Sequence, residues 1–271
     1  MKIKLIGKTI KRYLRLLASF FRYSLMGEME FRSSLLFWTV SNMLWLALGV
    51  IGVELIFGQI SDIAGWTKNE VFIVLFFSAL FNDVAWTLIY DNLDSFSRYI
   101  RYGKLDYQLL LPVNTRFLLS FRKLEFDHYV RIVLELGLIW QFTRLEVGHF
   151  SALNALAALF LFVCGFIIFY SLFFALTVCN IWFTNLANVL DFFGSLAELG
   201  KRPIDIFKRG WYVLFAYFLP VGFIATFPAE AILGKIDGRK LILAPVLALF
   251  SLFLSQKFFN FALKYYSSAS R

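Results

Sequence analysis

The chain has 271 residues, of which 60% are hydrophobic and only 17% are charged. Soluble domains average about 45–50% apolar residues, so a soluble fold of this composition would leave a large apolar surface in water. A bilayer accepts such a surface and requires backbone polar groups to pair within helices. The composition therefore excludes an ordinary soluble enzyme and predicts an all-α membrane protein, a single transmembrane domain over residues 1–271.

The formal net charge of +9 is the second global feature. Lys and Arg avoid the long apolar runs and cluster between them, which is the distribution that membrane topology requires. Nucleic-acid binding, another common use of basic charge, is therefore not expected.

Residues 1–30 are predicted to form a cytoplasmic amphipathic helix. One helical face carries Ile3, Ile6, Ile10, Leu14, Leu17 and Phe21, and the basic residues lie mostly elsewhere. This pattern is typical of a helix on anionic membrane lipid, with an ordinary packing helix as the alternative. Residues 1–33 lack the uninterrupted apolar run of a signal peptide, so we expect the segment to be retained.

Six apolar segments are predicted to span the membrane, because about 20 helical residues cover a hydrocarbon core of about 30 Å. They are residues 35–57, 71–92, 128–147, 152–183, 211–232 and 241–263. The fourth is longer than a crossing needs and is expected to tilt, kink near Gly165 or run past the membrane. The fifth contains Pro220, Gly222 and Pro228, so we expect it to bend or break.

The distribution of positive charge predicts the orientation. Six crossings place both termini on one side, and that side receives 22 of the 27 Lys and Arg residues. Cytoplasmic loops carry such an excess. We therefore expect a multi-pass protein of the plasma (inner) membrane with both termini in the cytoplasm.

Motifs for nucleotide chemistry are not found. Gly7-Lys8-Thr9 is similar to the end of a phosphate-binding loop, but Lys2 stands where that motif needs a glycine. Any nucleotide energy is expected to come from another chain.

A catalytic or metal centre is not expected either. His128 and His149 would lie about 31 Å apart along a helix, which prevents them from sharing a reaction or a metal. Cys164 and Cys179, the only cysteines, would lie about 22 Å apart, too far for a disulfide. We therefore expect no catalytic residue, no metal and no bound cofactor.

Ionisable residues within predicted spans are costly and need a compensating environment. Arg131 precedes Glu135 by four residues, so a structural ion pair is the favoured interpretation of these two. Asp83 follows Asn82 in the second span and has no local partner. We take both as candidates for a translocation path, with a buried and capped carboxylate as the alternative for Asp83.

Residues 93–127 form the predicted cytoplasmic coupling loop, which is basic yet rich in large apolar residues. Pro112 and Asn114 are expected to divide it into short pieces. Its apolar residues need a surface to bury against, on a soluble partner or on the membrane face. They include Leu105, Leu109, Leu110, Leu111, Val113 and Phe117.

The sequence of residues 100–113, Ile-Arg-Tyr-Gly-Lys-Leu-Asp-Tyr-Gln-Leu-Leu-Leu-Pro-Val, resembles the signature of a permease family of type-2 ABC exporters. A second stretch is similar to that family's closing segment, with Arg202-Pro203-Ile204, Pro220-x-x-Phe223 and Pro228 followed by Leu233-Gly234. Arg202 is a departure, because relatives usually have an aromatic residue before this proline. With the six predicted spans, the resemblance covers most of the chain.

The resemblance implies two permeases, identical or related, that sit on separate cytosolic ATPases, with ATP and Mg²⁺ bound by those partners. The coupling loop would receive their movement and substrate would pass between the permeases. Apolar residues would enter a groove on the ATPase, and Arg101, Lys104 and Arg116 would pair with acidic groups at its rim. The coupling residues would be Arg101, Gly103, Lys104, Leu105, Asp106, Leu110, Pro112, Val113 and Arg116.

Two other functions remain open on the residues alone. An ATP-independent transporter or channel would use polar groups within several spans, of which Asp83 is an example. An intramembrane enzyme acting on lipid would need a catalytic constellation that the His and Cys positions do not supply.

Overall fold

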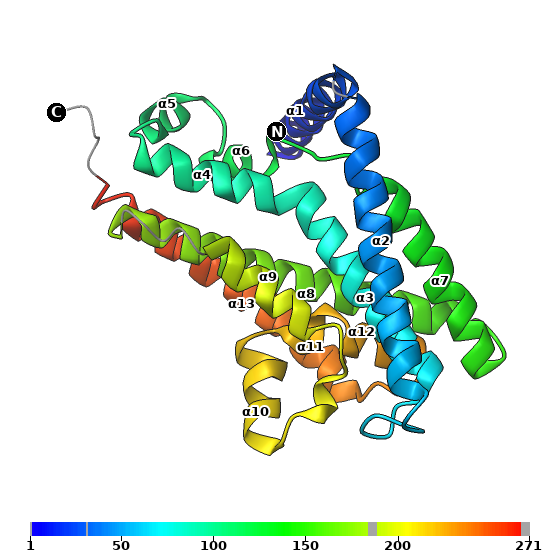
Figure 1. Ribbon diagram of the computed structural model, residues 1–271. Coiled ribbons are helices and arrows are strands. Elements are labelled where there is room, and N and C mark those ends of the chain that lie inside the picture. Colours follow the sequence, from blue (N-terminus) through cyan, green and yellow to red (C-terminus); the bar gives the residue numbers. More distant parts are fainter. Residues whose placement is uncertain (1, 31, 184–188, 267–271) are drawn as a thin grey trace.

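The computed structural model describes residues 2–30, 32–183 and 189–266, which form helices and connections without any strand (Figure 1). Within this part of the chain, four helices are long and apolar enough to cross a membrane. They are α2 (Arg32–Phe57), the continuous rod of α3 and α4 (Lys68–Arg101), α8 with its last turn (Ala152–Ile181) and α13 (Gly238–Ala262). These four helices overlap the predicted first, second, fourth and sixth spans.

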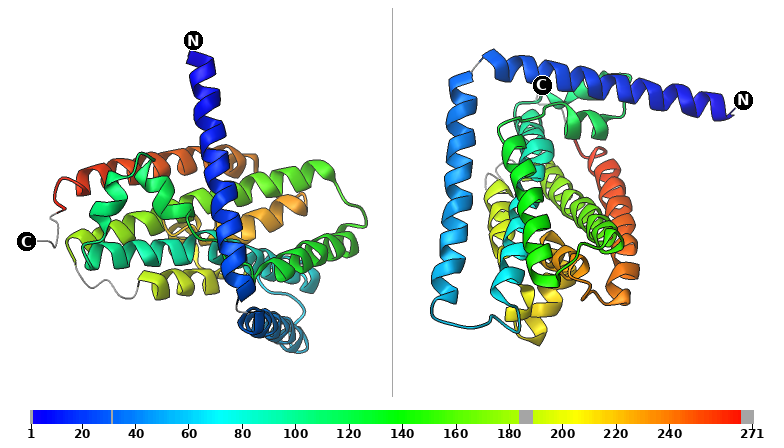
Figure 2. Two further views of the ribbon diagram at one scale, coloured as in Figure 1. Left: turned by 90° about the horizontal axis from the view of Figure 1, so that it is seen from above. Right: turned by 90° about the vertical axis from the view of Figure 1, so that its right-hand side faces the viewer.

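Helix α1 (Lys2–Glu30) runs across the end of α2 rather than alongside it (Figure 2). Its apolar side chains Leu14, Phe21 and Met26 remain exposed in this chain. Buried Ser24 receives a hydrogen bond of 3.1 Å from the Leu124 backbone N–H and so ties α1 to the segment before α7.

The predicted coupling loop is largely helical, which corrects its description as a loop. Helix α3 (Lys68–Ala85) starts at a capping box of Thr67 and Glu70 and continues through a π-helical turn (Trp86–Tyr90) into α4 (Asp91–Arg101). Two short helices follow, α5 (Leu105–Leu110) and α6 (Thr115–Phe121). The helix that contains the predicted second span therefore continues past residue 92 into the coupling region.

Helix α7 (Tyr129–Val147) matches the predicted third span in position and packs along α3. It is not among the four apolar helices, since it carries Arg131, Glu135 and Arg144. Arg131 and Glu135 are buried, whereas Arg144 is exposed. The polar groups of α7 therefore face the protein over its first two turns.

Helix α8 (Ala152–Val178) is the centre of the fold, with α13 beside it and α3, α11 and α12 packed on it. It remains helical through Gly165. A Cβ on Gly165 would lie 2.5 Å from the carbonyl oxygen of Phe223, so the glycine allows α11 to approach closely. Phenylalanine side chains fill much of the core, and the fully buried ones include Phe72, Phe76, Phe81, Phe169, Phe173 and Phe174.

The predicted fifth span, residues 211–232, is not one helix. It consists of α10 (Arg209–Val213), a π-helical turn (Leu214–Phe218), α11 (Val221–Ile224) and α12 (Thr226–Ile232), with breaks at Leu219–Pro220 and Ala225. None of these pieces is long enough to cross a bilayer. A helix that the sequence analysis did not anticipate, α9 (Val189–Leu199), precedes them and packs against α8.

The connection between α9 and α10 also differs from expectation. It contains a 3-10 turn (Ile204–Ile206), and Asp205 accepts a hydrogen bond of 3.0 Å from the indole N–H of Trp66. Trp66 belongs to the connection between α2 and α3, at the end of α2 away from α1 (Figure 1). The segment around Asp205 therefore lies toward that end of the molecule and not beside α1. The predicted orientation places its basic residues, Lys201, Arg202, Lys208 and Arg209, on the side of α1.

Candidate coupling surface and membrane groove

Helix α5 presents large apolar side chains to solvent. Leu110 is 84% exposed and Tyr107 63%, and Tyr102 in the preceding turn is 62% exposed. Leu105 on the same short helix is fully buried. Burial of one face anchors α5, and the opposite face leaves an unpaired apolar surface that we call the coupling surface (Tyr102, Tyr107 and Leu110).

Helix α1 supports the turn that follows α5. Arg12 donates a hydrogen bond of 2.6 Å to the carbonyl oxygen of Pro112, and the Asn114 backbone N–H donates to the Tyr13 hydroxyl at 3.1 Å. The Tyr13 and Phe117 rings meet edge to face, with their centroids 4.7 Å apart. The N-terminal helix and the coupling segment therefore form one structural unit.

Arg116 joins this unit to the helical core. Its guanidinium is buried and donates to the Tyr170 hydroxyl of α8 at 3.0 Å and to the Ser255 hydroxyl of α13 at 2.8 Å. It also lies over the Phe174 ring, 4.5 Å from the centroid. The expected contact between Arg116 and the acidic rim of a partner does not fit this geometry, because the side chain is enclosed among α6, α8 and α13.

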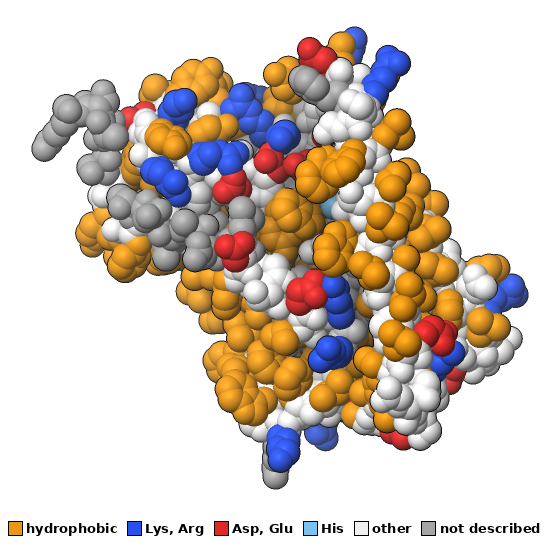
Figure 3. Space-filling view, viewed as in Figure 1, with side chains coloured by type: hydrophobic (Ala, Val, Ile, Leu, Met, Phe, Trp, Pro, Cys, Tyr) orange, Lys and Arg blue, Asp and Glu red, His pale blue; other side chains and the backbone are white. Residues whose placement is uncertain are grey.

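A groove of about 820 Å³ lies between α2 and α3, bordered by the start of α7 and the end of α9. Figure 3 shows this hollow beside α2, with hydrophobic side chains in its depth. On α2 it is lined by residues three to four positions apart, such as Trp38, Asn42 and Trp45, which share one helical face. Its volume falls within the range of small-molecule sites, about 300–1,000 Å³.

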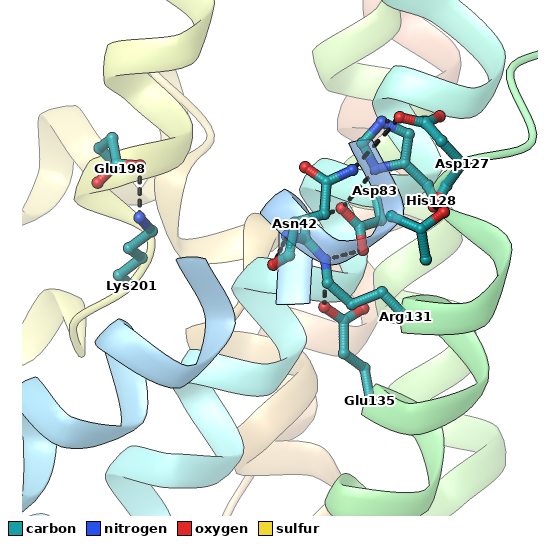
Figure 4. Close-up of polar contacts among 9 residues, drawn as sticks. Asn42, Asp83, Asp127, His128, Arg131, Glu135, Glu198 and Lys201 are labelled. Atoms are coloured by element: carbon teal, nitrogen blue, oxygen red, sulfur yellow. Dashed lines mark hydrogen bonds and ion pairs between the residues drawn. The ribbon is translucent and has the colours of Figure 1, made fainter. Parts of the chain in front are cut away.

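Behind the groove, α3 and α7 are joined by a buried ionic cluster (Figure 4). Arg131 forms ion pairs with Asp83 and, at 3.3 Å, with Glu135. The His128 ring lies 3.0 Å from Asp83, and Arg131 also donates to the carbonyl oxygen of Asn42 at 2.8 Å. Two buried carboxylates thus share one guanidinium, so removal of the cation would leave two buried acidic groups with only the His128 ring, beside Asp83, to compensate them.

Carboxylates gather at the end of the groove nearest α1. Glu28 of α1, Glu125 and Asp127 all line it. Burial raises the pKa of the Glu125 carboxyl to about 7, and the Asp91 and Asp127 carboxylates add to the rise. Burial, followed by Asp127, also raises the pKa of Glu28. Burial is the main cause of both shifts, the neighbouring carboxylates add to them, and Lys123 opposes them.

Two of these carboxylates and the neighbouring His128 are arranged as metal ligands would be. One ligand atom each from Glu125, Asp127 and His128 lies within 4.8 Å of the others, a donor set that a divalent ion such as Zn²⁺ accepts. The sequence analysis considered only the histidines and cysteines and therefore did not identify this group. Asn42 donates to Asp127 at 3.3 Å, so at least one of the carboxylates also has a partner within the protein.

Residues 43–270 match the family model described as ABC-2 family transporter protein. The chain belongs to the ABC-2 transporter family. No curated protein and no solved structure matches it. Family membership and the apolar helices together identify an integral membrane protein, the membrane permease of an ABC transporter.

The two residues proposed for the translocation path of the permease separate in the structure. Asn82 lines the groove, whereas Asp83 points into the ion pair with Arg131 and His128. No partner for Asp83 could be predicted from the sequence, because both partners come from the start of α7, more than 40 residues later. Arg131 lies between Asp83 and Glu135, so the expected two-residue pair is part of a larger cluster.

The residues predicted to couple the permease to an ATPase divide into exposed and buried groups. Arg101, Lys104, Leu110 and Pro112 are exposed, while Leu105 and Arg116 are buried. The remaining three, Gly103, Asp106 and Val113, are half-buried. Gly103 has a φ of 65°, and Asp106 faces Tyr266. The tryptophans and carboxylates of the groove were not identified from the sequence, although the run Lys-Leu-Glu-Phe-Asp-His at residues 123–128 is visibly charged.

Proposed function

We propose that this chain is the permease of an ATP-driven exporter of the plasma membrane, in which two permeases, identical or related, work with separate cytosolic ATPases. The observation that carries the coupling role is the exposed apolar surface of α5, in a chain whose family consists of ABC-2 transporters. ATP and Mg²⁺ belong to the ATPase partner in this proposal. Both ends of the chain face the cytoplasm, where α1 lies on anionic lipid.

In this proposal the coupling surface enters an apolar groove on the ATPase. Leu110 and Tyr107 are the central contacts, and exposed Arg101 and Lys104 pair with acidic groups at the rim. Gly103 permits the turn into α5, since its φ of 65° is unfavourable for other residues. Asp106 and buried Leu105 hold α5 against the rest of the permease.

Movement of the ATPase reaches the membrane helices by two routes. The first route is the continuous helix of α3, the π-helical turn and α4. Because α5 directly follows α4, a push on α5 acts on this helix. The other runs through Arg116, whose hydrogen bonds connect α6 to α8 and α13. Packed helices transmit such displacements because they shift as units rather than deform.

The groove beside α2 is the proposed entrance to the translocation path. Asn82 faces it, and the ionic cluster at Asp83 holds α3 against α7 behind it. A displacement of α3 would widen or narrow the groove. Substrate would then leave between the two permeases.

Co-purification with an ABC-type ATPase tests the coupling role. We expect Leu110→Asp to abolish the complex, because a carboxylate cannot be desolvated in an apolar groove, and Leu110→Met to retain it. Ile60→Asp is the matched control, an exposed apolar residue in the connection at the other end of α2. Unchanged assembly of Leu110→Asp with the ATPase would reject α5 as the docking element.

A further inference from the structure

The groove carries the opposite charge to the chain as a whole. Its two lining cations are already paired, Arg131 with Asp83 and Glu135, and Lys201 with Glu198. The acidic groups at its α1 end are Glu28, Glu125 and Asp127, of which Glu125 is partly protonated near neutral pH because its pKa is raised to about 7. In a protein with a formal charge of +9, this negative mouth selects against anions and in favour of cations.

Three tryptophans provide the second property of the groove. Trp38 and Trp45 of α2 and Trp86 at the start of the π-helical turn line it. Tryptophan is the aromatic side chain whose ring face attracts organic cations most strongly. Deeper in the groove the walls become apolar, for example at Leu46 and Leu75.

We infer that the groove binds a lipophilic organic cation, with its positive centre among the carboxylates and tryptophans and its apolar part against α2 and α3. This inference rests on the proposed function, for which it names the substrate class. A cationic drug-like molecule and a phospholipid with a choline group share this chemistry. The cavity of about 820 Å³ accommodates a positive centre surrounded by several rings or by an alkyl chain.

Binding of radiolabelled tetraphenylphosphonium to the purified permease in dodecyl maltoside tests the inference without any ATPase. Tetraphenylborate has nearly the same shape with the opposite charge and is the matched ligand. We expect saturable binding of the phosphonium only, and displacement by dodecyltrimethylammonium. If dodecylphosphocholine displaces the phosphonium as well as dodecyltrimethylammonium does, the groove is assigned to phospholipid. If dodecylphosphocholine displaces none of it, the groove is assigned to cations that carry no phosphate group. Either result supports a cation site.

Variants locate the site. Asp127→Asn should weaken phosphonium binding about tenfold, and Trp45→Ala about fivefold, the order expected for one charge and one ring facing a bound cation. Ser34→Lys places a cation at the exposed mouth without touching the core and should weaken binding similarly. Glu54→Gln, an exposed carboxylate outside the groove, should leave binding unchanged.

Absent saturable binding, equal binding of tetraphenylborate, or full affinity in both Asp127→Asn and Ser34→Lys would overturn the inference. A permease that still assembles with its ATPase but fails these tests would leave the proposed function standing and reject only the substrate class. A permease that neither assembles with the ATPase nor binds the phosphonium would instead point to a chain that does not transport by ATP coupling.

Discussion

At the scale of single residues, Arg131 is the side chain on which the junction of α3 and α7 most depends. It forms ion pairs with both Asp83 and Glu135, two carboxylates that are fully buried. Arg131→Met should lower the free energy of unfolding by about 3–5 kcal/mol, because it leaves buried charge without a partner.

Thermal unfolding in detergent measures this change. Arg144→Met, on the exposed end of the same helix, is the matched control and should cost little, since its guanidinium faces the Trp140 ring rather than a buried carboxylate. Equal unfolding temperatures for the two variants would show that the ionic cluster does not stabilise the fold.

Glu125 gives a prediction in pH. Its pKa rises to about 7 in the folded protein, chiefly by burial, so the folded state holds a proton between about pH 4.5 and 7 that the unfolded state has released. Stability must therefore fall as the pH rises through this window.

Glu125→Gln removes the titration, so the variant should gain stability relative to the wild type between pH 5 and 8. Unfolding temperatures at both pH values measure this difference, and Glu54→Gln, an exposed carboxylate, should follow the wild type. A constant difference between wild type and Glu125→Gln across the range would contradict the buried position of this carboxyl.

At the scale of elements, the packing of α11 on α8 depends on Gly165. A Cβ there would lie 2.5 Å from the Phe223 carbonyl oxygen, so Gly165→Ala must push α11 away and should cost about 1–3 kcal/mol. Gly137→Ala in α7 meets no atom within 4 Å and should be neutral or stabilising by up to about 1 kcal/mol. Thermal unfolding of the pair measures both, and similar effects would argue against the close approach.

Long apolar helices were the elements that sequence reasoning predicted best. Helices α2 and α13, with 26 and 25 residues, are long and apolar enough to cross a membrane, and this property can be read from composition alone. The break in the predicted fifth span was expected from Pro220, Gly222 and Pro228, and Leu219 and Ala225 do leave helical geometry. The short helices on either side of these breaks were not predicted. Composition measures affinity for lipid, whereas these breaks depend on how α11 and α12 pack on α8.

At the scale of the whole molecule, the motif at residues 100–113 predicted the family, and the family model over residues 43–270 confirms it. Which side chains of this region are buried and which are exposed could not be predicted. Leu105 and Arg116 are buried while Leu110 is exposed, because their positions are set by contacts with distant helices such as α8 and α13. The groove and its carboxylates likewise combine residues from four separate parts of the chain.

The orientation of the permease depends on the same long-range contacts. The bond between Trp66 and Asp205 takes the basic segment before α10 away from α1, so the positive charge is less one-sided than the sequence indicated. The basic residues of α1 and of the coupling segment still mark one side, and it is this side that we assign to the cytoplasm.

Accessibility of Lys104 tests the account most directly, since this exposed residue lies at the start of α5. In a background without Cys164 and Cys179, Lys104→Cys should react with a membrane-impermeant maleimide in inside-out vesicles and become protected when the ATPase is added. Gln59→Cys, in the opposite connection, should react only in intact cells. Labelling of Lys104→Cys from outside intact cells would contradict the coupling role.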